Sequence, residues 1–319
     1  MTDPIRLGLI GLGGWGRRIA ATIADLPGCV LAGVASRSPD AADHVPRGTP
    51  VVADWRDLLA NGDIQGVVIA TPPTVRGEIA GACIAKGLPT YLEKPIALNG
   101  RAAGALARSA EKAGTLLTAG HLHLYAPAFR AIHDGVKKAG GARRITSAGG
   151  NNGPFRSDYR ALLDYGPHDV SMALAVIGEP PRRVHASRTR GGDDGRSEVI
   201  EAELTFRDCT AVMRVGNLMD EKQRSFRVET QDGAFVYDDM ANDKAVHVLE
   251  DGMADPLSVE PQMPLAASLA RFGGLVRDGR TKDPDFAQAI TVMQVLDAIA
   301  LSVETGTPVL FEHDTALTV

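Results

Sequence analysis

The chain has 319 residues, of which 44% are hydrophobic and 23% charged, a composition typical of a globular protein with a sizeable core and unlike that of a disordered or fibrous chain. Its 34 basic and 39 acidic residues give a net charge of −5, which argues against a protein whose main role is to bind nucleic acid. The length predicts two domains, since a typical domain has about 150 residues.

The three cysteines bear on the cellular setting. Cys29, Cys83 and Cys209 are odd in number and far apart, which excludes a disulfide framework and a structural zinc site. The sequence shows neither a basic start followed by a long apolar stretch nor a run of about 18 apolar residues. We therefore expect a cytoplasmic protein with no membrane partner.

Residues 1–122 alternate short apolar runs with helical patterns. This rhythm is typical of βαβ units around a doubly wound parallel sheet, with helices on both faces. The predicted strands are residues 5–10, 30–35, 66–70, 90–92 and 115–120, and the predicted helices are residues 15–26, 54–60, 75–86 and 98–112.

A glycine-rich turn joins the first predicted strand to the first predicted helix. Gly11, Gly13 and Gly16 fit the pattern G-x-G-x-x-G, with Trp15 inside it. Glycines let the backbone turn sharply and approach a pyrophosphate, and the helix N-terminus directs amide hydrogens at its charge. The motif predicts a Rossmann domain in residues 1–122 that binds a nicotinamide dinucleotide; the alternative is a turn that only packs helix against strand.

The second predicted strand leads into Ser36 and Arg37, where such domains contact the adenosine ribose. A carboxylate at this point favours NAD, whereas serine and arginine can bind the 2′-phosphate of NADP. We therefore expect NADP as the cofactor. NAD is the alternative, in which Arg37 is an ordinary exposed arginine.

Two more loops follow strands of the same sheet. Thr71 and Pro72 come after the strand at 66–70, and they either border the nicotinamide or form only a rigid turn. Lys94 comes after the strand at 90–92. A lysine buried beside a positive nicotinamide ring loses its proton more easily, although most lysines are simply solvated.

After residue 122 the pattern changes to a series of alternating strands. It predicts a second domain, residues 123–319, of α+β type, built on a large, mostly antiparallel open sheet with one exposed or partner-covered face. Gln231, Asp232 and Gly233 predict a hairpin turn within it. The predicted helices are residues 127–138, 167–177, 265–277 and 285–304, and the predicted strands are residues 144–148, 183–188, 198–206, 211–217, 226–230, 234–237 and 244–249.

Asp164 and His168 form a second candidate site. Pro167 suits the first position of a helix, which places His168 in the first turn and Asp164 in the preceding loop. Histidine can exchange a proton with a substrate hydroxyl near neutral pH. The alternative is structural: an aspartate that stabilises a helix start and a half-buried histidine.

Other polar residues lie nearby. His121 and His123 are two residues apart on one side of an extended segment, but no third ligand follows at a diagnostic spacing, so we expect no metal. We expect both to line the cleft between the domains. Residues 151–159, with Arg156 and Tyr159 among them, form a loop that either holds substrate hydroxyls or is only solvated.

Together the glycine turn, Glu93-Lys94-Pro95 and Asp164-x-x-x-His168 give the chain its likeness to a known family. In this order, and followed by the sheet-rich second half, they make essentially the whole chain resemble the Gfo/Idh/MocA family, named after glucose–fructose oxidoreductase and inositol dehydrogenase. The resemblance implies an NAD(P)-dependent enzyme acting on CH–OH groups of a sugar, nucleotide sugar or cyclic polyol. It also implies a homo-oligomer formed through the open sheet.

The resemblance assigns roles to single residues. It makes Lys94 the lysine that orients substrate and transfers a proton, His168 the acid/base histidine, and Asp164 its companion. It implies that Thr71, Pro72 and Glu93 shape the cofactor site, to which Lys94 also belongs. The candidates for substrate contacts are His121, Tyr125, Arg156 and Tyr159.

Some positions depart from the family's pattern. Pro73 and Arg76 stand where the family often has asparagine and histidine, residues 160–163 replace a glycine-rich segment, and Ser171 replaces a frequent acidic residue. These departures concern the substrate more than the cofactor. Two alternatives therefore stand beside the sugar dehydrogenase: a dehydrogenase of a non-sugar ring such as a dihydrodiol, and a redox-silent regulatory protein that senses dinucleotides.

Overall fold

The computed structural model describes residues 3–311, which form two compact units. Unit 1 extends to Leu122 and also includes Met263–Ala289, and unit 2 comprises His123–Gln262 and continues from Ile290. The segment Met263–Ala289, which the sequence pattern assigns to residues 123–319, thus packs with the N-terminal residues.

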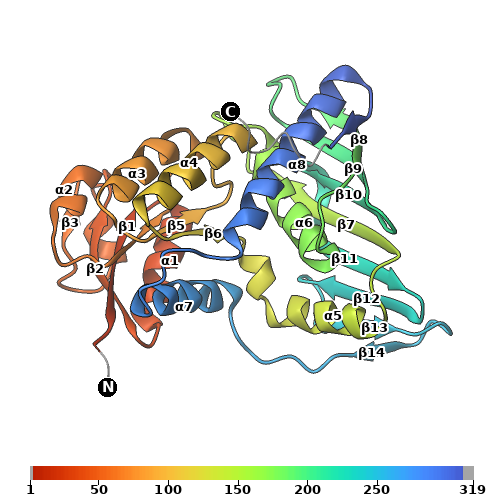
Figure 1. Cartoon of the computed structure of the whole chain (residues 1–319), viewed down its shortest axis with the longest axis horizontal. Coiled ribbons are helices and arrows are strands. Elements are labelled where there is room, and N and C mark those ends of the chain that lie inside the picture. The colour runs from red at the N-terminus through yellow and green to blue at the C-terminus, as the bar shows by residue number, and fades with distance from the viewer. Residues whose placement is uncertain (1–2, 312–319) are drawn as a thin grey trace. The chain divides into compact units, whose positions relative to one another are not determined.

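Unit 1 is a doubly wound α/β fold around a fully parallel six-stranded sheet of order β3-β2-β1-β4-β5-β6. Helices α3 and α4 lie on one face and α1 and α7 on the other (Figure 1). The strands are β1 Ile5–Ile10, β2 Cys29–Ala35, β3 Val51–Val52, β4 Gly66–Ile69, β5 Thr90–Glu93 and β6 Leu117–Gly120, and the helices are α1 Gly14–Asp25, η1 Ala41–His44, α2 Trp55–Ala60, α3 Pro73–Ala85, α4 Gly100–Ala113 and α7 Pro264–Arg277. The predicted Rossmann architecture is confirmed.

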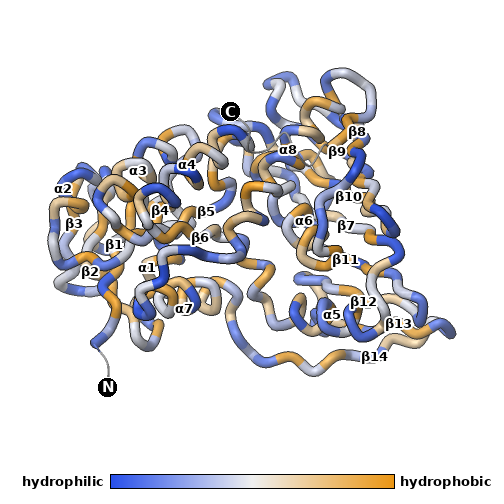
Figure 2. Tube along the Cα trace, in the orientation of Figure 1, coloured by the Kyte–Doolittle hydropathy of each residue, from blue (hydrophilic) through white to orange (hydrophobic). Residues whose placement is uncertain are grey.

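The core of unit 1 explains why α7 joins it. β4 is buried along its whole length, and β1 is buried except for Arg6, because helices cover both faces of the sheet. Figure 2 shows hydrophobic stretches of chain among the strands of this unit. On α7, Leu269 and Phe272 are fully buried in the same cluster as Leu7 and Leu9 of β1. The hydroxyls of Tyr91 and Ser268 also form a buried hydrogen bond of 3.0 Å, which fixes α7 to β5.

Unit 2 is built on a nine-stranded sheet of order β14-β13-β12-β11-β7-β10-β9-β8-β15. β7 and β10 run parallel and the other neighbouring strands of this sheet are antiparallel, so the predicted mostly antiparallel sheet is confirmed. Helices α5, α6 and α8 lie on one face (Figure 1). The strands are β7 Arg144–Asn152, β8 Arg183–Gly191, β9 Glu198–Thr205, β10 Thr210–Gly216, β11 Leu218–Thr230, β12 Gly233–Asp238, β13 Ala245–Val248, β14 Ala254–Pro256 and β15 Val309–Leu310, and the helices are η2 Leu122–Tyr125, α5 Pro127–Lys138, α6 Ala161–Ile177 and α8 Phe286–Thr305.

Two details of unit 2 bear on the sequence predictions. The hairpin at Gln231-Asp232-Gly233 forms as predicted, with Thr230 paired to Gly233 and Gly233 at φ +120°. In the part of the chain that the structure describes, α8 is the one helix long and apolar enough to span a bilayer by length and composition. Half of its apolar window is buried in the protein, and the core helix of a globular protein has the same features.

Candidate functional site

The glycine-rich turn of unit 1 has the geometry that a dinucleotide requires. Gly11 follows β1 with φ +98°, and a Cβ on it would lie 2.9 Å from the carbonyl oxygen of Ala70. A Cβ on Gly16 would lie 2.1 Å from the carbonyl oxygen of Gly11. Both positions therefore require glycine, the first for its conformation and the second for the close packing of α1 on the turn.

The N-terminus of α1 is open. Gly13 is its N-cap, and among residues 3–311 no side chain caps the helix there. A Cβ on Gly13 or Gly14 would meet no described atom within 4 Å. The first turn of α1 thus lacks a side-chain cap and has space around its first two glycines, which fits a pyrophosphate seated on a helix N-terminus.

The loop after β2 carries the residues expected to meet the adenosine ribose. Ser36 accepts a hydrogen bond from the Ser38 amide at 3.2 Å, and Arg37 is exposed. A carboxylate does lie in this loop, a feature that the spacing of the sequence did not indicate: Asp40 accepts hydrogen bonds from the Ser38 hydroxyl and, at 2.8 Å, from Arg17. These donors, Ser38 first, hold the pKa of Asp40 well below its usual range, so its charge is already paired on the protein.

Lys94 lies directly after β5, between two buried neighbours. It is itself partly exposed. Glu93 is 2% exposed, and burial raises the pKa of its carboxyl group. The Glu93 carboxylate accepts the Lys94 backbone N–H at 3.2 Å and a hydrogen bond from the Trp15 side chain, which links this loop to the start of α1.

Several buried polar atoms near these loops have no hydrogen-bond partner among the described residues, and three of them belong to neutral side chains. They are Oγ1 of Thr71 after β4, Oγ1 of Thr118 in β6, and Nε2 of His121 after β6. Buried polar atoms are normally paired, so unpaired ones indicate a place for a polar ligand. The carboxamide of a nicotinamide has both donors and an acceptor, and these residues therefore fit the cofactor that the glycine turn implies.

His121 is neutral over most of the pH range. Burial, and secondly the charge of Lys94, lower its pKa from 6.5 to about 4. Between these pH values the unfolded chain takes up a proton that the folded protein does not. His121 therefore lowers the free energy of unfolding as the pH falls.

A substitution of His121 should remove this pH dependence. At pH 7 His121 is mostly neutral in the folded and in the unfolded protein. Near pH 4.5 the free energy of unfolding of the wild type should be lower by about 2–3 kcal/mol relative to that of His121→Gln. Urea unfolding at the two pH values measures the difference. Exposed His185→Gln is the matched control, and an equal pH dependence of wild type and His121→Gln would contradict the assignment.

In unit 2 the predicted start of the helix at Pro167 is wrong. α6 begins at Ala161, with Pro167 inside it. The N–H of Ala161 donates to the carbonyl of Arg196 at 2.9 Å, and that of Leu162 to the Glu198 carboxylate at 3.3 Å. These contacts with distant segments hold the first turns despite the hydrogen bond that the proline removes.

The longer helix changes the relation between the candidate residues. Asp164 and His168, four positions apart on α6, share one face of it, and they are 8% and 6% exposed. The Nε of Arg156 donates to Asp164 Oδ2 at 3.2 Å, and the Arg156 guanidinium lies 5.9 Å from the ring centre of Tyr159. Unit 2 therefore brings together four of the predicted site residues. The sequence placed residues 151 and 152 in the polar loop, but they are the last residues of β7, which extends through pairing with β11.

His168 has a second histidine beside it that was not predicted to contact it. The rings of His123 and His168 meet edge to face with centres 4.6 Å apart, and His123 Nδ1 lies 3.0 Å from the Tyr237 hydroxyl. The prediction of an extended segment is wrong here, since β6 ends at Gly120 and His123 lies in the short helix η2. The sequence analysis selected His121 as a substrate contact and not His123, because spacing alone does not reveal tertiary contacts such as this one.

Asp169, next to His168, anchors the same helix. It is fully buried, and its Oδ2 lies 3.7 Å from Arg224 of β11. Burial raises the pKa of this carboxyl group. A Cβ on Gly149 of β7 would lie 2.4 Å from Asp169 Oδ2, so glycine leaves the space that this pair occupies.

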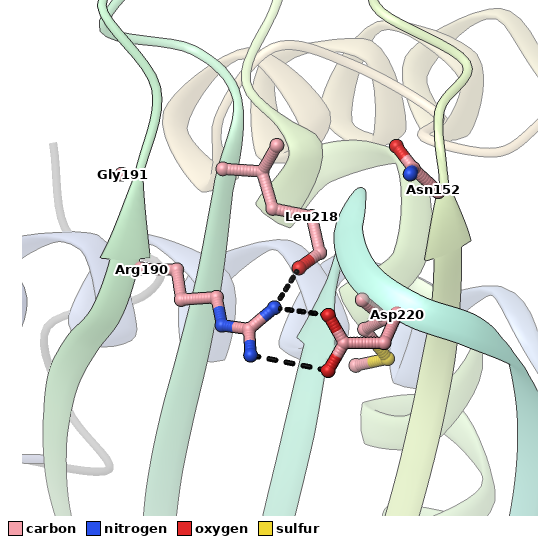
Figure 3. Close-up of a pocket in the computed structure, with 6 residues that line it drawn as sticks. Asn152, Arg190, Gly191, Leu218 and Asp220 are labelled. Carbon is pink, nitrogen blue, oxygen red and sulfur yellow. Dashed lines mark hydrogen bonds and ion pairs between the residues drawn. The ribbon is translucent and has the colours of Figure 1, made fainter.

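A shallow pocket of about 450 Å³ lies at the ends of β7, β8 and β11 (Figure 3). Its cation, Arg190, forms two hydrogen bonds to the Asp220 carboxylate, of 2.7 and 3.1 Å, and one to the Leu218 carbonyl. The positive charge is thus paired within the protein, and the pocket does not fit an anionic ligand. No group of three or more histidine, cysteine, aspartate or glutamate side chains within residues 3–311 is placed to hold a metal ion.

The remaining predicted residues fall in both units. Lys94, Thr71, Pro72 and His121 belong to unit 1, and Tyr125, which is 7% exposed, belongs with Asp164 and His168 to unit 2. The convergence of Lys94 with His168 and Asp164 on one substrate stays a prediction.

Comparison with known proteins gives consistent matches. A family model described as "Oxidoreductase family, NAD-binding Rossmann fold" matches residues 5–121. The chain is 26% identical to D-xylose 1-dehydrogenase (NADP+) 2 of Haloferax volcanii, over 95% of this chain and 98% of the relative, and 21% identical to scyllo-inositol 2-dehydrogenase (NADP+) of Bacillus subtilis, over 92% and 95%. A solved structure of an inferred oxidoreductase from Magnetospirillum magnetotacticum MS-1 has a TM-score of 0.85 and 35% identity, and the match covers 92% of this chain and 99% of that one.

Proposed function

The chain belongs to the Gfo/Idh/MocA family of oxidoreductases, and from this membership we propose that it transfers a hydride between a nicotinamide cofactor and a carbinol or ketone carbon of a sugar, nucleotide sugar or cyclic polyol. It is an NAD(P)-dependent oxidoreductase. The relatives named for xylose and scyllo-inositol support a polyhydroxylated substrate.

One observation carries the proposal furthest: a nearly buried imidazole and a carboxylate share one face of α6. A protein that only senses a dinucleotide does not need such a pair. Asp164 is oriented by Arg156, and His168 contacts His123. A positioned acid–base pair of this kind is what removal of a proton from a hydroxyl requires.

The cofactor would be held by residues of unit 1. The open N-terminus of α1 would bind the pyrophosphate, Ser36 and Arg37 the adenosine ribose, and Thr71, Pro72 and Glu93 would border the nicotinamide. When bound, the nicotinamide supplies the hydride chemistry.

The protein's own residues then move the proton. In the oxidation direction His168 would take the proton of the substrate hydroxyl as the carbon gives up its hydride, with Lys94 orienting that hydroxyl and sharing in the transfer. Removing the proton in step with the hydride avoids a full charge on the oxygen, a contribution of about 10²- to 10⁴-fold in rate. Asp164 would orient His168 or a neighbouring substrate hydroxyl.

The change in absorbance at the reduced-nicotinamide band tests this function. The protein is mixed with NADP+ or NAD+ and a panel of aldoses, inositols, nucleotide sugars and dihydrodiols. We expect turnover with a sugar, nucleotide sugar or polyol. Turnover with dihydrodiols alone would select the non-sugar dehydrogenase, and binding of the cofactor without turnover on any panel member would select the redox-silent regulator.

We infer further that the cofactor is NADP, because the exposed Arg37 at the end of β2 can bind a 2′-phosphate. Arg37→Asp should raise the dissociation constant of NADPH about 10- to 100-fold, the range expected for losing a hydrogen bond to a charged group, and leave that of NADH within threefold. Titration of cofactor fluorescence measures both constants. Arg47→Asp, at another exposed arginine of unit 1, is the control. Equal changes for the two cofactors would mean that Arg37 does not select between them.

A further inference from the structure

Arg76 is a buried cation at the carboxyl edge of the sheet of unit 1. It lies in α3 and is 3% exposed. A buried guanidinium is costly unless its N–H groups find acceptors. Its NH1 donates to the backbone carbonyl of Glu93 at 2.5 Å and to that of Pro95, and its NH2 donates to the backbone carbonyl of Thr71.

These acceptors have a definite relation to Lys94. Glu93 and Pro95 are the residues on either side of it, so one guanidinium holds the backbone both before and after the proposed catalytic lysine. The third acceptor belongs to Thr71, at the end of the neighbouring strand β4. A single side chain therefore joins the loop that carries Lys94 to the loop that borders the nicotinamide.

The chemistry of arginine suits this arrangement. A guanidinium presents five N–H donors in a rigid planar fork. The lysine ammonium is a compact point charge, and a neutral imidazole has one N–H. The contact with three carbonyls therefore depends on the arginine that this chain has at position 76.

We propose that Arg76 is a positioning residue for Lys94: by holding the carbonyls of Glu93, Pro95 and Thr71 it fixes the lysine relative to the nicotinamide loop. The inference rests on the proposed function, in which Lys94 handles the substrate's proton. It adds a residue that acts through the backbone and touches neither substrate nor cofactor.

The first measurement is local amide hydrogen exchange in the full-length protein. In Arg76→Gln, peptides that cover residues 70–72 and 93–97 should exchange at least about tenfold faster, because the hydrogen bonds that fix both loops are lost. Peptides from β1 and α1 should be unchanged. Arg56→Gln is the matched control, since Arg56 is an exposed arginine of the same unit that pairs with Glu78 of α3 at 2.7 Å. Arg76→Lys, which keeps the charge, covers the case in which the glutamine variant does not fold.

The second measurement is steady-state kinetics on the same proteins. We expect kcat to fall about 100-fold in Arg76→Gln, as for a reacting group misplaced by about 1 Å, with the KM for substrate and the dissociation constant of NADPH within threefold of wild type. Arg76→Lys should recover part of kcat, and Arg56→Gln should equal wild type.

The possible outcomes distinguish a failure of the positioning role of Arg76 from a failure of the proposed oxidoreductase function. In a wild type that turns over substrate, unchanged exchange at 93–97, or loosened exchange with unchanged kcat, would overturn the positioning role alone. A wild type that reduces no cofactor with any substrate would overturn the proposed function and the positioning role with it.

Discussion

Lys94→Ala is expected to lower kcat about 10³-fold while the dissociation constant of NADPH stays within threefold of wild type. The expected loss lies within the range for removal of a general acid or base. Binding should persist because the groups that fit the pyrophosphate and the ribose lie at the turn after β1 and at the end of β2, and not on Lys94. Stopped-flow absorbance gives the rate, and cofactor fluorescence gives the binding constant.

A matched lysine controls for the loss of charge. Lys112→Ala removes an exposed lysine of α4 in the same unit and should leave both constants unchanged. Lys94→Arg keeps the positive charge but holds its proton at all accessible pH values, so it should restore little of the rate. A Lys94→Ala protein with kcat within threefold of wild type would remove the lysine from the mechanism.

His168→Gln is expected to lower kcat at least about 100-fold and to flatten the dependence of kcat on pH. Glutamine has a similar size and can form hydrogen bonds but does not titrate, so the variant isolates the proton transfer from the packing of α6. The buried Asp169–Arg224 pair should hold the helix in place, and the thermal unfolding of the variant should resemble that of wild type.

The pH profile decides between the two roles weighed for His168. If His168 is only structural, its substitution should lower the stability of the protein and leave the shape of the pH profile unchanged. If His168 is the general base, its substitution should remove the limb of the kcat profile that reports its titration. Exposed His185→Gln should change neither property. Loss of stability with an unchanged profile would assign His168 to the core and not to catalysis.

The sequence predicted the architecture well because local patterns encode it. The βαβ rhythm and the glycine turn specify unit 1, and the proline at the start of α5 marked the helix Pro127–Lys138 at its observed bounds. The two-residue strands β3 and β15 and the three-residue β14 went unpredicted, since so few residues carry no readable period.

The failures have a common physical cause, which is that tertiary contacts outweighed local signals. Pro167 is a good helix start in isolation, but contacts of Ala161 and Leu162 with residues far along the chain extend α6 past it. In the same way α7 follows the antiparallel strands in sequence yet buries Leu269 and Phe272 in unit 1. A periodic pattern shows that a helix has an apolar face but not which core receives it.

The site was predictable only in part, for the same reason. Lys94, Asp164 and His168 could be selected because they lie in recognisable motifs. The roles of Arg76, His123 and Asp169 depend on burial, and a buried arginine looks like a solvated one in the sequence. Self-association through the open sheet, a cytoplasmic location and the preference for NADP stay predictions.

The transfer of deuterium tests the central claim most directly. A substrate found in the panel is prepared with deuterium at the carbon to be oxidised, and the reduced cofactor is isolated and analysed by mass spectrometry and proton NMR. The account predicts one deuterium at C4 of the nicotinamide and a slower rate for the labelled substrate. Reduced cofactor without deuterium would show that the hydride does not come from that carbon and would contradict the account.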